Sequence, residues 1–228
     1  FYLLIYATIV FIGSDPKQTM PAKNSVKQFI ENGYYHVYNR GVEKRVIFQD
    51  EQDYAVFLNY LKRYLEPPHG SDPKSLTNEV DLITFCLMPN HFHLLAKQIT
   101  KNGITKLIRA VCTKYVMYFN RKYERVGTLF QGKYKAAMVD NDNYLLHLSR
   151  YIHLNPAYPG SDPISYNYSS FSYYLGQKSS TWVKPQEILT FFRTAKRIGK
   201  KDYLSYQSFV EDYPIDSAEI LGELTLES

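Results

Sequence analysis

The chain has 228 residues and a mass of 26.7 kDa, and its 27 Lys and Arg residues outnumber its 22 Asp and Glu residues, for a formal charge of +5. Hydrophobic residues make up 45% of the chain and charged residues 21%, which is typical of a globular protein and excludes a disordered or fibrous one. The two cysteines, Cys86 and Cys112, exclude a disulfide framework and a four-cysteine zinc site, and they favour a reducing compartment.

The N-terminal segment is apolar but short. Residues 1–12 form an almost unbroken apolar run, shorter than the roughly 20 residues that cross a bilayer. No basic region precedes the run and no small-residue cleavage site follows it. We expect translation to start at Met20 and residues 1–19 to be a doubtful extension. A genuine strand or buried helix and a membrane anchor are the alternatives.

Hydrophobic periodicity predicts an α+β protein. The expected elements, in chain order, are a strand at 34–39, a helix at 50–65, strands at 80–88 and 91–97, a helix at 104–123, a loop and strand within 126–135, and helices at 141–155 and 186–193. This order predicts a ferredoxin-like sandwich, an antiparallel sheet with helices on one face. We divide the chain into the extension 1–19, a domain at 20–175 and a C-terminal appendage at 176–228.

Charge is distributed unevenly along the chain. Residues 101–135 contain nine Lys or Arg residues and one acidic residue, whereas residues 211–228 contain six acidic residues and no basic one. Aromatic residues lie among the basic ones, a combination that binds phosphates and stacks on unpaired bases. A solvated helix face is the alternative. The acidic tail is expected to be a mobile C-terminus.

A histidine pair and a later helix carry the residues best suited to chemistry. His91 and His93 are two apart on a predicted strand, so both imidazoles point to one face and can meet one metal ion. Tyr151 and Asn155 are four apart on a predicted helix and share a face. The Asn155 amide oxygen can complete the metal site, with Tyr151 placed to attack a phosphate. Ordinary surface histidines and a core tyrosine are the alternatives.

Four blocks of the sequence carry a family resemblance. They are HVYNRG at 36–41, LMPNHFHLL at 87–95, YFNRKYERVGTLFQGKYKA at 118–136 and YLLHLSRYIHLNPAYPG at 144–160. In this order they resemble the HUH (His-hydrophobic-His) transposases with a single catalytic tyrosine, of the IS200-like type, and most closely the branch of REP-associated tyrosine transposases. The resemblance implies an HUH endonuclease domain of ferredoxin-like fold. It places the nucleophile at Tyr151, the paired metal-binding histidines at His91 and His93, and the amide ligand at Asn155.

The implied activity is cleavage and rejoining of single-stranded DNA through a 5′-phosphotyrosine, with Mg²⁺ or Mn²⁺ as cofactor. Co²⁺ and Zn²⁺ also suit two imidazoles and an amide. Hairpin-forming repeats are the expected DNA partner, no membrane partner is expected, and monomer and homodimer both remain open. His147 is a candidate base. The candidates for phosphate contacts are Arg40, Arg121, Lys122, Arg125, Lys133 and Lys135.

Two other functions remain open from the sequence. One is a non-catalytic DNA-binding or regulatory relative, and the other is a metal-dependent phosphodiesterase or RNA-processing enzyme that forms no covalent adduct. The cysteine content and the expected DNA partner predict a location in the bacterial cytoplasm, in association with the nucleoid.

Overall fold

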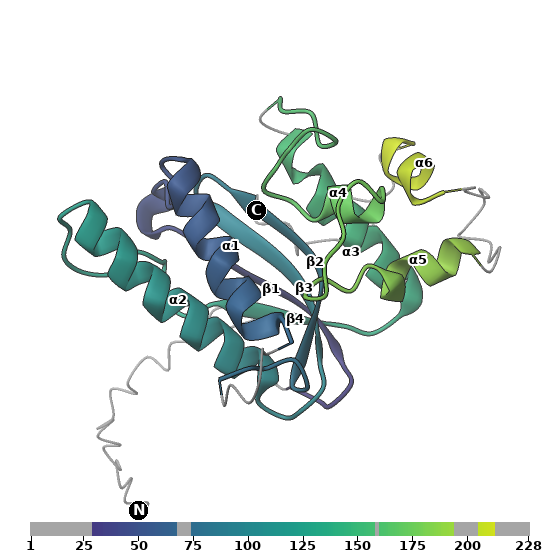
Figure 1. The fold of residues 1–228 in the computed structure, drawn as a ribbon, viewed down its shortest axis with the longest axis horizontal. Coiled ribbons are helices and arrows are strands. Elements are labelled where there is room, and N and C mark those ends of the chain that lie inside the picture. The colour runs from purple at the N-terminus through teal and green to yellow at the C-terminus, as the bar shows by residue number, and fades with distance from the viewer. Residues whose placement is uncertain (1–28, 68–73, 158–159, 194–204, 213–228) are drawn as a thin grey trace, which may run out of the picture.

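The structure is a computed structural model that describes residues 29–67, 74–157, 160–193 and 205–212 (Figure 1). The predicted extension at 1–19, the proposed start at Met20 and most of the acidic tail lie outside the described residues. None of the described helices is both long enough and apolar enough to cross a membrane.

Four strands form one antiparallel sheet, in the spatial order β2-β3-β1-β4. The strands are β1 (Tyr34–Arg40), β2 (Val80–Met88), β3 (His91–Gln98) and β4 (Lys135–Val139). Helix α1 (Glu51–Leu65) follows β1, and α2 (Gly103–Lys122) follows β3. The predicted α+β class and the antiparallel sheet with its β-α-β-β-α-β order are therefore confirmed.

One strand differs in position from the sequence prediction. The loop and strand expected within 126–135 are mostly loop, and β4 begins only at Lys135. Its register with β1 pairs Tyr38 with Lys135 and Tyr34 with Val139. Because this strand lies at the edge of the sheet, pairing with β1 fixes its bounds, and local sequence preference does not.

Helices cover both faces of the sheet. Helices α1 and α2 lie side by side on one face, as predicted, and enclose a core with residues such as Val37, Phe92 and Leu94 (Figure 1). Helix α3 (Asp142–Leu154) packs on β2 and β3 from the other face, where Leu95 lies in its core. The helices are thus not restricted to one face, because β2 and β3 present apolar side chains on both sides.

The chain beyond α3 adds to both cores. The short 3-10 helices lie at Val42–Lys44 and Asn155–Ala157, and the remaining helices are α4 (Phe171–Tyr174), α5 (Gln186–Arg193) and α6 (Tyr206–Glu211). Trp182 belongs to the core under α1 and α2, and Phe209 to the core around α3. Residues on both sides of position 175, the predicted domain boundary, therefore share the same cores.

Candidate active site

Alternate residues of β1 and β3 form the face of the sheet that meets α3. Tyr38 pairs with His93 and Arg40 with His91 in the antiparallel register. Since directly paired residues point to the same face, these four side chains share it. Phe92 lies between the histidines in sequence and packs in the opposite core, as the alternation requires.

Two tight turns hold the ends of these strands. At the end of β1, a Cβ atom on Gly41 would lie only 2.1 Å from the Arg45 carbonyl oxygen, so only glycine fits there. The Gly41 amide donates to the Asn90 carbonyl at 2.8 Å, which joins this turn to the one between β2 and β3. Together they fix Arg40 and His91 beside each other.

The hydrogen bonds of His91 determine which of its nitrogens is available. Its Nδ1 lies 2.6 Å from Asn90 Oδ1, and the Asn90 amide nitrogen donates to the Lys44 carbonyl. His91 Nδ1 therefore carries the proton and Nε2 carries a lone pair. That Nε2 lies 3.4 Å from Asn155 Oδ1, whose amide nitrogen donates to the Tyr151 carbonyl. Two acceptors thus face each other with no proton between them.

His93 is fully buried and supplies a second open nitrogen. Its Nδ1 lies 2.8 Å from His36 Nε2, and its Nε2 has no hydrogen-bond partner. Burial lowers the pKa of His36 to about 3 and that of His91 to about 4, and burial together with the neighbouring His91, His36 and Arg40 lowers the pKa of His93 well below its usual value. The three imidazoles are therefore neutral at pH 7, the form that coordinates metals.

Tyr151 packs against the two buried histidines. Its ring centroid lies 5.6 Å from that of His93 and 6.4 Å from that of His36, and its side chain is nearly buried. Tyr151 lies on α3, and Asn141 caps the N-terminus of that helix, since its side chain accepts a hydrogen bond from the Tyr144 amide. One turn beyond Tyr151, Asn155 ends the helix beside His91.

The side chains of His91, His93 and Asn155 provide lone-pair atoms that suit a divalent cation. His91 Nε2 and Asn155 Oδ1 converge as acceptors, and His93 Nε2 is a buried nitrogen without a partner. Within the described parts of the chain, no group of three His, Cys, Asp or Glu side chains is placed to hold a metal. The groups that lie together here are two imidazoles and one amide, and their role as metal ligands stays a prediction.

His36 is the member of this cluster to which sequence reasoning gave no role. It lies in the same block as Arg40, and the alternation of β1 places both side chains on the face of Tyr38. If His93 Nδ1 donates to His36 Nε2, the lone pair of His93 is on Nε2, where a cation requires it. The signal available in the sequence was the two-residue period from His36 to Arg40.

His147, the candidate base, is held by other groups. Its Nδ1 accepts a hydrogen bond from the Arg150 guanidinium at 2.8 Å, and its ring packs on Phe209 of α6. The Arg150 guanidinium also lies over the Phe209 ring and donates to the Phe209 carbonyl. These contacts give His147 a role in joining α3 to α6.

The predicted phosphate-binding residues divide between two regions. Arg40 and Lys135 lie on the face of the histidines, because Lys135 pairs with Tyr38 across β1 and β4. Arg40 Nε is buried without a hydrogen-bond partner among the described residues, and its charge lowers the pKa of both His91 and His93. This face therefore presents a cationic group beside the open histidine nitrogens.

The other predicted contacts lie at the C-terminal end of α2 and in the following loop. Arg121 and Lys133 are exposed, and Arg125 donates to the Asn120 side chain. Lys122 forms ion pairs with Asp50 at 2.6 Å and with Asp53 at 2.8 Å. These ion pairs give Lys122 a structural role, and its contact with DNA stays a prediction.

Replacing Asp53 by Ala is expected to lower the free energy of unfolding by about 3–5 kcal/mol. The carboxylate is fully buried and accepts hydrogen bonds from Lys122, Tyr118, Tyr123 and the Gln49 amide. All four would lose this acceptor, and Lys122 and Tyr123 would retain only the half-exposed Asp50. Urea unfolding followed by circular dichroism measures the loss. The half-exposed Asp50 is the control, and its replacement by Ala should lower the free energy of unfolding much less, mostly through the lost helix cap. Equal losses for the two variants would contradict this view of the cluster.

Comparison with a solved structure of the same fold supports the architecture. A structure described as the REP-associated tyrosine transposase bound to a REP hairpin aligns with a TM-score of 0.50 and 14% sequence identity, over 70% of this chain and 90% of that one. A protein described as a transposase of Deinococcus radiodurans R1 aligns with a TM-score of 0.35 and 14% identity, over 57% of this chain and 95% of that one. No curated protein sequence gives a significant match.

The family profile described as transposase IS200-like matches residues 29–155. The match includes all four strands, helices α1 to α3 and each member of the histidine cluster. Since the profile covers more than half of the 228 residues, this chain belongs to the IS200-like transposase family, and the resemblance to that family seen in the four sequence blocks is confirmed.

Proposed function

We propose that this protein is a metal-dependent transposase that cleaves and rejoins single-stranded DNA through a covalent link to Tyr151. The observation that carries the proposal is the approach of His91 Nε2 to Asn155 Oδ1 at 3.4 Å. Beside it, the His93 ring lies 4.9 Å from the His91 ring and 5.6 Å from the Tyr151 ring, and His93 Nε2 has no hydrogen-bond partner. Such a cluster on a sheet face beside a phenol suits phosphoryl transfer better than simple DNA binding. A protein that only binds DNA has no need of a buried imidazole nitrogen without a hydrogen-bond partner.

A divalent cation held by His91, His93 and Asn155, Mg²⁺ or Mn²⁺ in our proposal, would supply Lewis-acid activation of the scissile phosphate. The residues of the chain do the rest. Tyr151 Oη bonds to phosphorus, the bond from phosphorus to the 3′-oxygen breaks, and that oxygen leaves with a proton while the phenol loses one. The 5′-phosphate stays on Tyr151 as a phosphodiester, so the reverse attack by a 3′-hydroxyl rejoins the strand without an external energy source.

Positive side chains would position the strand. Arg40, whose guanidinium lies beside the histidines, is suited to hold the oxygens of the scissile phosphate. Lys135 extends the same positive face, and Arg121, Arg125 and Lys133 would contact phosphates elsewhere along the DNA. A hairpin with a single-stranded flank is the proposed substrate. The structural neighbour was solved with a hairpin, which supports the choice. For a protein acting on DNA we propose a bacterial cytoplasmic location near the nucleoid.

The test is a denaturing gel of the protein mixed with a labelled single-stranded hairpin taken from DNA beside its own gene. With Mn²⁺ or Mg²⁺ we expect a slow band that contains both protein and DNA, and with EDTA we expect none. Cleavage without this covalent band would instead identify a hydrolytic phosphodiesterase. A shifted band on a native gel without any cleavage, across several metals, would identify a non-catalytic DNA-binding protein.

A further inference from the structure

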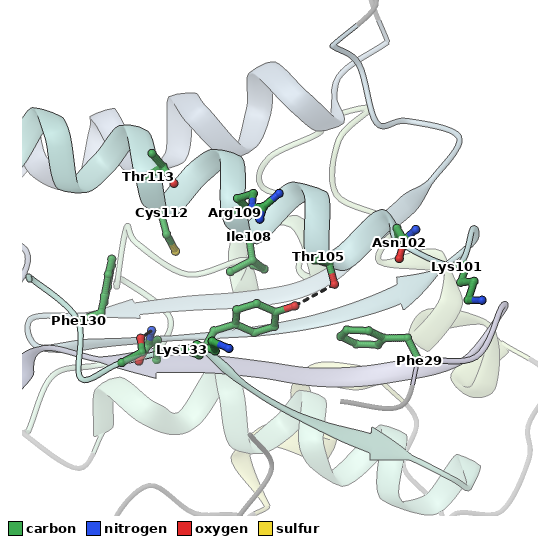
Figure 2. A pocket seen from close by; sticks show the side chains of 13 residues that line it. Phe29, Lys101, Asn102, Thr105, Ile108, Arg109, Cys112, Thr113, Phe130 and Lys133 are labelled. Carbon is green, nitrogen blue, oxygen red and sulfur yellow. Dashed lines mark hydrogen bonds between the residues drawn. The ribbon is translucent and has the colours of Figure 1, made fainter. Parts of the chain in front are cut away.

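A cavity of about 730 Å³ lies between α2 and the edge of the sheet, away from the histidine cluster (Figure 2). Asn39 lines it from β1 and points to the face opposite that of Tyr38 and Arg40. The cavity is therefore on the α1 and α2 side of the sheet, whereas the proposed active site is on the α3 side. Its volume is in the range of sites that hold small organic ligands.

The inner surface of the cavity is apolar and aromatic. Phe29, Phe130 and Tyr134 contribute rings, and Ile108 adds an aliphatic wall. A hydrogen bond of 3.1 Å between the Tyr134 and Thr105 hydroxyls holds the tyrosine ring against α2, as Figure 2 shows. Fixed aromatic rings provide surfaces on which a flat ligand can stack at little cost in side-chain entropy.

The rim of the cavity is cationic. Lys101, Arg109 and Lys133 are exposed, and their side chains form no ion pair or hydrogen bond within the described residues. Two lysines of α2 differ in this respect, because Lys106 pairs with Glu79 and Lys122 with Asp50 and Asp53. The net positive charge that the sequence shows in this region is thus left uncompensated at the cavity.

The polar groups at the rim include an amide that the fold does not use. Asn102 precedes α2, but its side chain makes no capping hydrogen bond. It lies beside Lys101 on one side of the opening, in line with Thr105 and Arg109 along α2 (Figure 2). An amide can both donate and accept, which is what the edge of a nucleobase requires.

We propose that this cavity binds one unpaired nucleotide of the single-stranded flank of the DNA substrate. A ligand with a flat face for the rings, hydrogen-bonding edges for Asn102 and a negative charge for the rim has the chemistry of a nucleotide. A DNA strand can reach the cavity from the proposed active site around the β4 edge of the sheet, since Lys133 at the cavity is two residues from Lys135 on the face of the histidines. A strand crossing the β4 edge would meet both lysines. This inference rests on the proposed action on DNA.

The experiment compares two DNA ligands and two matched variants. Fluorescence anisotropy measures binding, without divalent metal, of a hairpin with a single-stranded flank and of the same hairpin without it. Arg109→Ala is expected to weaken binding of the flanked hairpin about tenfold and to lower its salt dependence by about one unit of log–log slope. It should leave the unflanked hairpin unchanged. Arg63→Ala, the same exposed charge removed from α1 away from the cavity, should change neither ligand.

A second measurement identifies the contact directly. A photoreactive 5-iodouracil in the flank should crosslink to the cavity rings, Phe29, Phe130 or Tyr134, as identified by mass spectrometry of the peptides. The proposal is overturned if Arg109→Ala and Arg63→Ala bind the flanked hairpin alike and the crosslinks map elsewhere. Wild-type protein that still forms the covalent Tyr151 adduct would then keep the proposed function intact. If the wild-type protein formed no covalent adduct but crosslinked to DNA at the cavity, only the proposed function would be overturned.

Discussion

Replacing Tyr151 by Phe is expected to remove the covalent protein–DNA adduct completely, a loss of at least about 10³-fold in rate, and to leave DNA affinity within about twofold. The substitution deletes only the hydroxyl that would bond to phosphorus, and the ring still packs on His93 and His36. Adduct formation on a denaturing gel and binding by fluorescence anisotropy check the two halves of this prediction.

Tyr144 provides a matched control on the same helix. It is also nearly buried, two turns before Tyr151, and its hydroxyl has no hydrogen-bond partner among the described residues. Tyr144→Phe should therefore retain the adduct and the fold. If Tyr144→Phe lost the adduct and Tyr151→Phe kept it, the nucleophile would be assigned to the wrong tyrosine. If both variants formed adducts as the wild type does, neither hydroxyl would be the nucleophile.

Replacing His93 by Ala should lower the affinity for Mn²⁺ at least about 100-fold and abolish adduct formation. The substitution deletes the buried imidazole whose Nε2 has no partner in the protein, and a donor set of two groups holds a divalent ion poorly. Isothermal titration calorimetry with Mn²⁺ on the DNA-free protein measures the affinity independently of activity.

Substitutions of neighbouring histidines should have smaller effects on Mn²⁺ affinity. His36→Ala should reduce Mn²⁺ affinity about tenfold, because it removes the acceptor that orients His93 through Nδ1. His36→Gln, which keeps an acceptor, should recover part of that loss. His153→Ala is the control for removing a buried imidazole, since both nitrogens of His153 are engaged by Tyr206 and Ser170. A Mn²⁺ affinity for His93→Ala equal to that of His153→Ala would exclude His93 as a ligand.

Features that depend on short-range geometry could be predicted from the amino-acid order alone. The two-residue period of a strand was enough to place His91 and His93 on one face, and the spacing of four in a helix was enough to bring Tyr151 and Asn155 together. Most element bounds were predicted within one or two residues, because capping residues such as Asp50 and Asn141 mark them locally.

Features that depend on contacts between residues far apart in sequence could not be predicted and are known from the folded chain. Pairing with β1 places β4 at Lys135–Val139, later than its composition suggested. Because β2 and β3 carry buried apolar side chains on both faces, α3 packs on the face opposite α1 and α2. No local pattern in the sequence carries either piece of information, because each depends on which surfaces remain available once the other elements have packed.

The same distinction holds for individual side chains. Lys122 and Arg109 are equivalent in a count of basic residues, but folding brings Lys122 to Asp53 and leaves Arg109 at the rim of a cavity. Similarly, His36 meets His93 only because β1 lies beside β3. The sequence fixes which chemical groups the protein has and their local periodicity, whereas burial and long-range pairing decide which of those groups are left to act, since each contact made in folding uses up a donor, an acceptor or a charge.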